Sequence, residues 1–169
     1  MREFCEKQPN ELKEVNLFLL KTFLLQLKLL TNTNMSKNND IDNTTKFLYA
    51  FTQNILDIDR SIRWVGITDQ NGNIINERYR EGIKLILTPE ETHEWAIRTI
   101  TRHITRFKHE SKMGKLTYLF RRYTRMSRCL IPINENYYLI LTMDFDQYNF
   151  DKIITEKIIP LIKQEKEKF

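Results

Sequence analysis

The sequence predicts an α+β fold in which the elements follow the order α-β-β-α-β-β-β-α. Two observations carry this prediction. Apolar residues recur at helical spacing over about 45–56, 88–109 and 150–166. Between these segments lie short runs of β-branched and aromatic residues that end in turn-forming residues. We therefore expect a five-stranded, largely antiparallel sheet with helices on both faces.

A hairpin follows the first helix. Residues 63–68 read RWVGIT and have the composition of a strand, and Asn71-Gly72 supplies the positive φ angles of a tight turn. A second strand is expected over 73–79. The first strand is apolar on both of its faces, which is typical of a sheet that is covered on both sides.

The second helix has a marked start. Thr88 is a favourable N-cap, Pro89 suits the first helical position, and Glu91 completes a capping box. The helix is expected to continue to about His109. Its buried stripe is expected to consist of its large apolar residues, Ile97, Ile100, Ile104 and Phe107.

Three strands and a final helix complete the predicted domain. The strands are expected over 116–124, 127–132 and 137–144. The final helix is expected over about 150–166, with Pro160 kinking or restarting it. The last residues, 163–169, read KQEKEKF and are expected to be a solvated, fraying end.

The chain is expected to divide into three parts. With 169 residues, of which 41% are hydrophobic, it has material for one core. Residues 1–34 form either an amphipathic helix or an extension from an over-called start codon, with Met35 as the native start. Residues 35–44 read as a polar linker, and 45–169 as the domain. The apolar run over 15–30 contains two lysines and is too short for a membrane span, so membrane contact would need an interfacial helix over 11–30.

With this element order, the stretch WVGITDQNGNII after the first helix resembles the roadblock family, whose dynein-light-chain-like fold is close to that of profilins. The resemblance covers 45–163. The phrases ITDQNGNII, LTPEET and MGK also resemble short archaeal proteins of that type. The resemblance implies a non-enzymatic interaction module, dimeric through the second helix and third strand, that acts as a scaffold or as a regulator of a small Ras-like GTPase.

Residues capable of catalysis do not form a recognisable set, so we expect no enzyme activity, no cofactor and no metal. His93 and His103 lie too far apart on one helix to share a metal ion. Cys129 lies on an apolar strand and reads as a core residue. The acid pairs 57/59 and 144/146 read as helix-end and turn residues. The two cysteines are 124 residues apart, which favours a reducing cytoplasm.

Positive charge is concentrated in one region. Ten basic residues and one acidic residue between Arg98 and Arg128 give that stretch a charge of +9, so the rest of the +5 chain carries −4. We expect a basic partner-binding face with seven arginines, namely Arg98, Arg102, Arg106, Arg121, Arg122, Arg125 and Arg128. Like charges disfavour burial against a second copy, so the partner is either an acidic protein or a copy bound through other elements.

Two other functions remain open. GAF and PAS sensor domains share much of this element order, and Trp64, Tyr118 and Tyr138 would then line a ligand pocket. Alternatively, the basic face with its interleaved aromatic residues would bind nucleic acid. A solvated basic face that binds nothing is the simplest interpretation of the same charges.

Overall fold

The computed structural model describes residues 43–106 and 109–169. The chain divides into two compact units, Met1–Lys46 and Phe47–Phe169, and most of the first unit falls outside the described residues. The expectations for 1–34 and for most of 35–44 therefore stay predictions. In the described ranges, no helix has the length and hydropathy that crossing a membrane requires.

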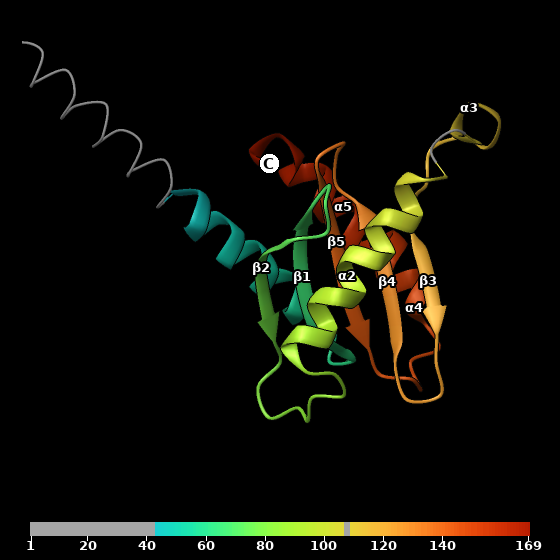
Figure 1. Cartoon of the computed structure of the whole chain (residues 1–169). Coiled ribbons are helices and arrows are strands. Elements are labelled where there is room, and N and C mark those ends of the chain that lie inside the picture. Colours follow the sequence, from blue (N-terminus) through green and yellow to red (C-terminus); the bar gives the residue numbers. More distant parts are fainter. Residues whose placement is uncertain (1–42, 107–108) are drawn as a thin grey trace, which may run out of the picture. The chain divides into compact units, whose positions relative to one another are not determined.

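The second unit is built on a five-stranded sheet that is antiparallel throughout, as Figure 1 shows. The strand order across the sheet is β2-β1-β5-β4-β3, so β2 and β3 are its edges. The strands are β1 (Ile62–Asp69), β2 (Ile74–Tyr79), β3 (Leu119–Arg122), β4 (Ser127–Pro132) and β5 (Tyr137–Met143). The predicted fold class is therefore confirmed. β3 is shorter than predicted at both ends: pairing with β4 begins only at Leu119, and the chain turns after Arg122, where the Tyr123 amide donates to the Met126 carbonyl at 2.8 Å.

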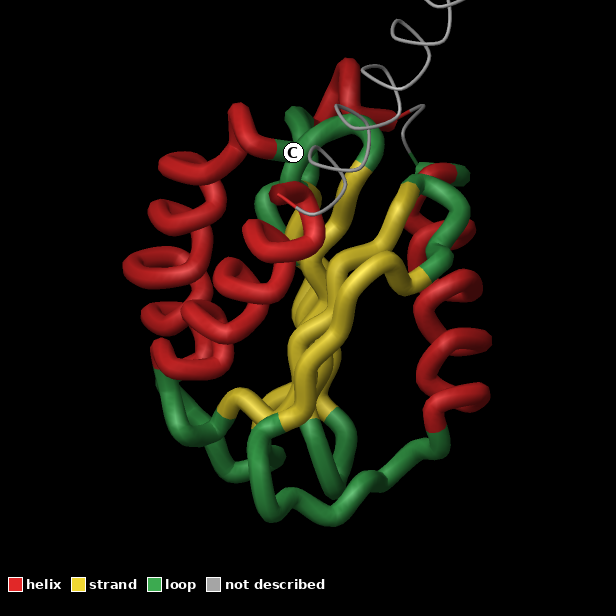
Figure 2. Tube along the Cα trace, turned by 90° about the vertical axis from the view of Figure 1, so that its left-hand side faces the viewer, coloured by secondary structure: helices red, strands yellow, loops and turns green. Residues whose placement is uncertain are grey.

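Helices cover both faces of this sheet (Figure 2). One face carries α2 (Pro89–Ile104), which is followed by the short α3 (Glu110–Met113). The other face carries the helix over 43–58 and the C-terminal helix. The C-terminal helix consists of α4 (Phe150–Lys152), a π-helical turn (Ile153–Ile158), α5 (Ile159–Glu165) and a 3₁₀ turn (Lys166–Lys168). Pro160 lies in the first turn of α5, directly after the π-helical turn, and the backbone stays helical on both sides of it, so the chain continues through the proline without a break.

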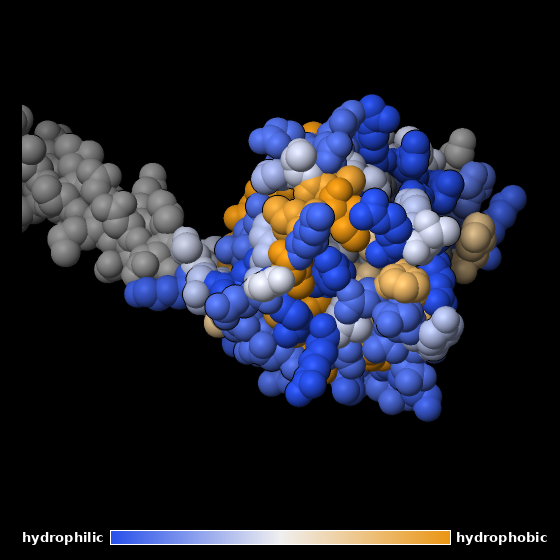
Figure 3. Space-filling view, turned by 90° about the horizontal axis from the view of Figure 1, so that it is seen from below, coloured by the Kyte–Doolittle hydropathy of each residue, from blue (hydrophilic) through white to orange (hydrophobic). Residues whose placement is uncertain are grey.

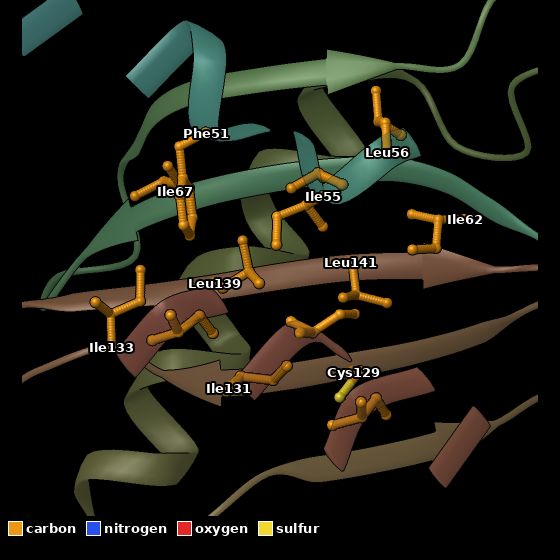
Figure 4. Close-up of a cluster of buried hydrophobic side chains, with 14 of the residues drawn as sticks. Phe51, Ile55, Leu56, Ile62, Ile67, Cys129, Ile131, Ile133, Leu139 and Leu141 are labelled. Atoms are coloured by element: carbon orange, nitrogen blue, oxygen red, sulfur yellow. The ribbon is translucent and has the colours of Figure 1, made fainter. Parts of the chain in front are cut away.

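Side chains from the two faces of the sheet form two separate core clusters. The larger cluster lies between the sheet and the helices over 43–58 and 150–165, and Figure 4 shows its centre around Ile55, Ile67, Leu139 and Leu141. The smaller cluster lies under α2. It consists of Trp64, Ala96, Ile100, Leu130, Tyr138 and Ile140. Strand residues alternate between the clusters, so the sheet is buried on both faces as predicted.

The β1–β2 turn brings the hairpin against α2. Asp69 Oδ1 accepts hydrogen bonds from the Asn71 and Asn73 amides at 2.8 and 2.9 Å. Partial burial alone would raise the pKa of Asp69, but the hydrogen bonds from Asn73 and Asn71 outweigh it and lower that pKa. Gly72 has φ +85°, and a Cβ there would lie 2.5 Å from the Cα atom of Ile97. Only glycine fits at this position without displacing α2.

Arg80 joins β2 to the end of the first described helix. Its Nε donates to the Ile62 carbonyl at 2.7 Å, and its Nη2 donates to the Asp59 carbonyl at 2.8 Å and to the Leu56 carbonyl. The Leu56 carbonyl belongs to the last turn of the helix over 43–58, where carbonyls lack helical partners. The guanidinium therefore caps that helix and fixes the connection into β1.

The last residue of the chain belongs to the core boundary, which corrects the expectation of a fraying end. The Phe169 ring lies edge-on to the rings of Phe47 and Phe51, at 5.1 Å between centroids in both cases, and 6.0 Å from the ring of Tyr137. The six preceding residues are polar, so the sequence pattern gives no indication of this contact. A single aromatic residue is enough to hold this end of the chain against the domain, because contacts between aromatic rings add stability to that gained by burying the ring.

Replacing Phe169 with alanine is expected to lower the free energy of unfolding by about 2 to 3 kcal/mol, since a half-buried ring loses three aromatic contacts. Urea denaturation followed by circular dichroism measures the change. Tyr148→Ala serves as the control because that ring is 74% exposed, and we expect a loss of at most about 1 kcal/mol. Equal stability of the Phe169→Ala variant and the native chain would show that the end does not stabilise the domain.

Candidate interaction surfaces

α2 begins as the sequence predicts. The Thr88 Oγ1 atom accepts a hydrogen bond from the Glu91 amide at 3.2 Å, and Glu91 Oε2 accepts one from the Thr88 amide at 2.8 Å. Together they form the capping box, which satisfies two amides at the start of the helix. The helix is therefore firmly defined at the end that lies nearest the loop from β2.

The buried side of α2 differs from the prediction. It is formed mainly by small residues, with one isoleucine and one histidine: Thr92, Ala96, Thr99, Ile100 and His103. Ile97 and Ile104 are instead 36% and 38% exposed, and Phe107 lies outside the described residues. Small side chains let the helix backbone come close to Gly72 and to the large rings of Trp64 and Tyr138. Ile97 follows Ala96 by about 100° around the helix and so points away from the sheet.

The outward face of α2 combines apolar side chains with a division of charge. Ile97 and Ile104 are seven residues apart, so they lie on the same side of the helix, two turns from each other. The N-terminal half carries three exposed acids, Glu90, Glu91 and Glu94. Three exposed arginines lie on the C-terminal half and just after the helix, namely Arg98, Arg102 and Arg106. Arg98 Nη2 pairs with Glu94 Oε1 at 2.5 Å, so one acid and one base are already neutralised.

The seven arginines of the predicted basic face lie in several different places. Arg98, Arg102 and Arg106 are exposed along α2, as the helical spacing predicts. Arg121 lies opposite Arg128 in the β3–β4 pair, on the α2 face of the sheet. Arg122 lies on the other face, where its Nη2 donates to the Phe145 carbonyl at 2.6 Å and its Cζ lies 4.5 Å from the ring centroid of Tyr148. Arg125 is exposed in the β3–β4 turn. These residues therefore do not form one continuous face.

Arg128 differs from the other arginines because it is buried, with 3% of its surface exposed. Its Cζ atom lies 3.8 Å from the ring centroid of Trp95 on α2. Within the described part of the chain, its Nε and Nη1 atoms have no hydrogen-bond acceptor and no carboxylate forms an ion pair with it. Burial lowers the pKa of Arg128 to about 10, so the side chain stays charged at neutral pH.

Arg128 opens onto a cleft at the end of the sheet where β5 ends and β1 begins. The inner recess of this cleft measures about 30 Å³ and is lined by Trp64, Tyr79, Thr92 and Met126 as well as Arg128. A wider outer part of about 270 Å³ is lined by Thr124, Arg125 and Phe145. Four residues line both parts, namely Arg63, Lys84, Leu85 and Ile86. We call the two parts together the end cleft, and Figure 3 views this end, where hydrophobic side chains are surrounded by hydrophilic ones.

The described histidine and cysteine side chains lie in different surroundings. His93 and His109 are exposed, whereas His103 is buried beside Tyr138, with ring centroids 5.4 Å apart. Burial lowers the pKa of His103, so its neutral form is favoured near pH 7. Cys129 is fully buried in the larger core cluster, and burial raises the pKa of its thiol well above the usual range. A thiol with a raised pKa is a poor nucleophile.

Three of the four acids in the predicted pairs have structural partners in the described residues, namely Asp57, Asp59 and Asp144. Asp57 accepts two hydrogen bonds from Gln53 Nε2 at 3.0 Å each, and Asp59 Oδ1 accepts one from Ser61 Oγ at 2.7 Å. Asp144 Oδ1 pairs with Arg63 Nη1 at 2.7 Å. Over residues 43–106 and 109–169, no group of three or more histidine, cysteine or acidic side chains is placed to hold a metal ion.

The three aromatic residues considered for a ligand pocket do not come together. Trp64 and Tyr138 are packed in the cluster under α2, with 3% and 1% of their surfaces exposed. Tyr118 packs against the larger cluster instead, and its hydroxyl donates to Asp151 Oδ1. This bond raises the pKa of Tyr118 to about 12. Trp64 and Tyr138 therefore belong to the packed cluster under α2, and Tyr118 to the other cluster.

Comparison with solved structures identifies the fold. The chain is similar to the gliding protein MglB of Thermus thermophilus, with a TM-score of 0.60 and 12% identity over 75% of this chain and 93% of that one. It is also similar to MglB of Myxococcus xanthus, with a TM-score of 0.55 and 14% identity over 72% and 96% of the two chains. A roadblock/LC7 domain from Streptomyces avermitilis gives a TM-score of 0.55 and 7% identity, over 69% and 92%.

These similarities, which cover 69% to 75% of the chain, show the roadblock fold and confirm the fold that the sequence resemblance implied. No protein-family model matches the sequence, and no curated protein sequence matches it significantly. The likeness therefore lies in the arrangement of elements, at identities of 7% to 14% among the three structures described above.

Proposed function

We propose that the protein is a non-enzymatic interaction module that forms a homodimer through the outward face of α2. The observation that carries this proposal is the pair of exposed isoleucines, Ile97 and Ile104, on a helix with acids in one half and arginines in the other. A structure described as MglB with a tetrameric arrangement shares this fold, with a TM-score of 0.59 and 12% identity over 75% of this chain. That arrangement belongs to the other protein and supports self-association here only by analogy.

The charge division on α2 removes the objection that like charges oppose a dimer. In a two-fold dimer the same surface meets itself, so two copies of α2 that cross in an antiparallel direction place the acidic half of one against the basic half of the other. Ile97 of one copy then faces Ile104 of the other, because both lie on one side of the helix. Glu90 and Glu91 would be drawn toward Arg102 and Arg106 of the second copy, since Glu94 already pairs with Arg98.

The test of the dimer is the double variant Ile97→Glu/Ile104→Glu. We expect it to raise the dimer dissociation constant by at least about 100-fold. Each isoleucine occurs twice in a two-fold interface, and at each of these positions the variant would bury a charged side chain in place of an apolar one. Sedimentation equilibrium measures the constant. Met113→Glu is the matched control, since Met113 is 84% exposed and lies outside α2. A native chain that remains monomeric at millimolar concentration would contradict the proposal.

A scaffold or a regulator of a small Ras-like GTPase is the role that we propose for this dimer. The roadblock fold and the resemblance of the sequence to that family support it. Purified Ras-like GTPases of the same organism, loaded with GDP or with a GTP analogue, provide the test. We expect one nucleotide state to bind at micromolar or tighter affinity, and binding of none of them would refute this role.

A further inference from the structure

Arg128 is the least expected charged group of the domain. Its guanidinium is enclosed between β4 and α2, and the Trp95 ring is its aromatic neighbour. A ring face stabilises a cation only partly, and an uncompensated buried charge is costly. Because Nε and Nη1 have no acceptor in the described ranges, the side chain has unused capacity to bind an anion.

The charges around the end cleft favour an anionic ligand. Lys84, Arg125 and Arg128 all line the cleft, and Arg63 adds a fourth cation that Asp144 already neutralises. The carboxylate of Glu77 is also engaged, because its Oε2 accepts hydrogen bonds from Trp64 Nε1 at 2.9 Å and from the Tyr79 hydroxyl at 3.3 Å. No acidic side chain lines either part of the cleft, and Lys84, Arg125 and Arg128 form no ion pair with the described carboxylates.

The dimensions of the cleft limit what enters it. An inner recess of about 30 Å³ admits one or two water-sized groups. A carboxylate fits such a space, whereas a nucleobase does not. The outer part is about nine times larger, and its apolar side chains include Leu85 and Phe145, which are 46% and 50% exposed. The cleft therefore suits a ligand with a carboxylate at its end and apolar groups beside it. An acidic peptide segment has this combination of groups.

We propose that the end cleft binds an acidic segment of a partner protein. An aspartate or glutamate side chain of that segment enters the inner recess and pairs with Arg128. The residues on either side of it lie against Leu85 and Phe145 in the outer part, where Lys84 and Arg125 attract further acidic side chains. This surface is separate from the exposed isoleucines of α2, so the inference does not depend on the dimer.

The two tryptophans of the chain provide a direct probe. Trp64 lines the inner recess, and Trp95 stacks on Arg128, so fluorescence of the full chain reports on the cleft. The ligand to titrate is a capped pentapeptide that alternates glutamate and leucine, and its glutamine counterpart is the neutral control. We expect a saturable change with the glutamate peptide and an affinity at least about 10-fold weaker for the glutamine peptide. The glutamate peptide should bind more weakly as sodium chloride is added.

Variants locate the binding site. Arg128→Met is expected to reduce affinity for the glutamate peptide at least about 10-fold and to remain folded, since replacing a buried charge by an apolar side chain of similar volume is often neutral or stabilising. Arg125→Gln on the rim is expected to reduce it about two- to five-fold. Arg102→Gln removes the same charge from α2 and should leave binding unchanged. The Ile97→Glu/Ile104→Glu variant should also bind the peptide, which separates this inference from the dimer.

Several outcomes would overturn the proposal. One is equal binding of the glutamate and glutamine peptides, and another is unchanged binding by both the Arg128→Met and Arg125→Gln variants. Sodium acetate and inorganic phosphate are titrated in parallel. If either small anion changes the fluorescence at the same concentration as the peptide, the outer part of the cleft contributes nothing and the site is not one for a protein segment.

Discussion

Replacing Gly72 with alanine is expected to lower the free energy of unfolding by about 2 to 5 kcal/mol. About 1 to 2 kcal/mol comes from a non-glycine residue in the left-handed region, and about 1 to 3 kcal/mol from overpacking. The overpacking is unavoidable because the new Cβ would meet backbone atoms, the Cα and N of Ile97 at 2.5 and 2.9 Å, which cannot rotate away. Urea denaturation followed by circular dichroism measures the loss.

Gly82 provides the matched control for this change. It also has a positive φ, +74°, but a Cβ there would have no atom within 4 Å. Gly82→Ala therefore isolates the backbone strain and should cost only about 1 to 2 kcal/mol. If the two variants lose the same stability, the close approach of the hairpin to α2 does not matter. Because Gly72 meets α2 beside Ile97, Gly72→Ala should also weaken the proposed dimer.

Replacing Arg80 with methionine is expected to lower the free energy of unfolding by about 3 kcal/mol. The variant keeps much of the side-chain volume but loses charge-assisted hydrogen bonds to three carbonyls. Each such bond contributes about 1.5 to 3 kcal/mol, and water that hydrogen-bonds to the freed carbonyls offsets part of the loss. The loss should be local as well as global. We expect faster amide hydrogen exchange over residues 55–62, measured by NMR, because the end of the first described helix is no longer capped.

Two further variants test whether the hydrogen bonds of Arg80 are responsible. Arg60→Met removes the same charge from an exposed position four residues after Leu56, and it should change stability by less than about 0.5 kcal/mol. Arg80→Lys keeps the charge, but a single ammonium cannot reproduce the planar fork of donors, so it should restore only part of the loss. Full restoration by lysine would show that charge alone, and not the geometry of the guanidinium, stabilises this junction.

Segments with strong local signals were predictable from the sequence. β4 has the predicted bounds, Ser127–Pro132, because a turn limits it on each side. The start of α2 follows from its capping box. The order of elements follows from their periodicity and turn residues, and it was enough to indicate the roadblock fold.

The features that were missed depend on contacts between distant residues. Hydrophobic periodicity counts Ile97 and Ile104 as core, but the actual contact of α2 uses Ala96 and small threonines because Gly72 lets the backbones approach. Phe169 is an isolated apolar residue after a charged run, so only its contacts with Phe47 and Phe51 reveal its role. Arg128 was counted as surface charge because arginine is rarely buried without an acid.

The position of β3 has a consequence for how the arginine-rich region behaves in solution. β3 is an edge strand of only four residues, and two of these are Arg121 and Arg122. A short, charged edge resists the addition of a strand from another molecule, which is the first step of many aggregation processes. These arginines therefore help to keep the protein from aggregating even where they bind no partner. Loss of binding after their mutation is interpretable only when light scattering shows that the variant has stayed dispersed.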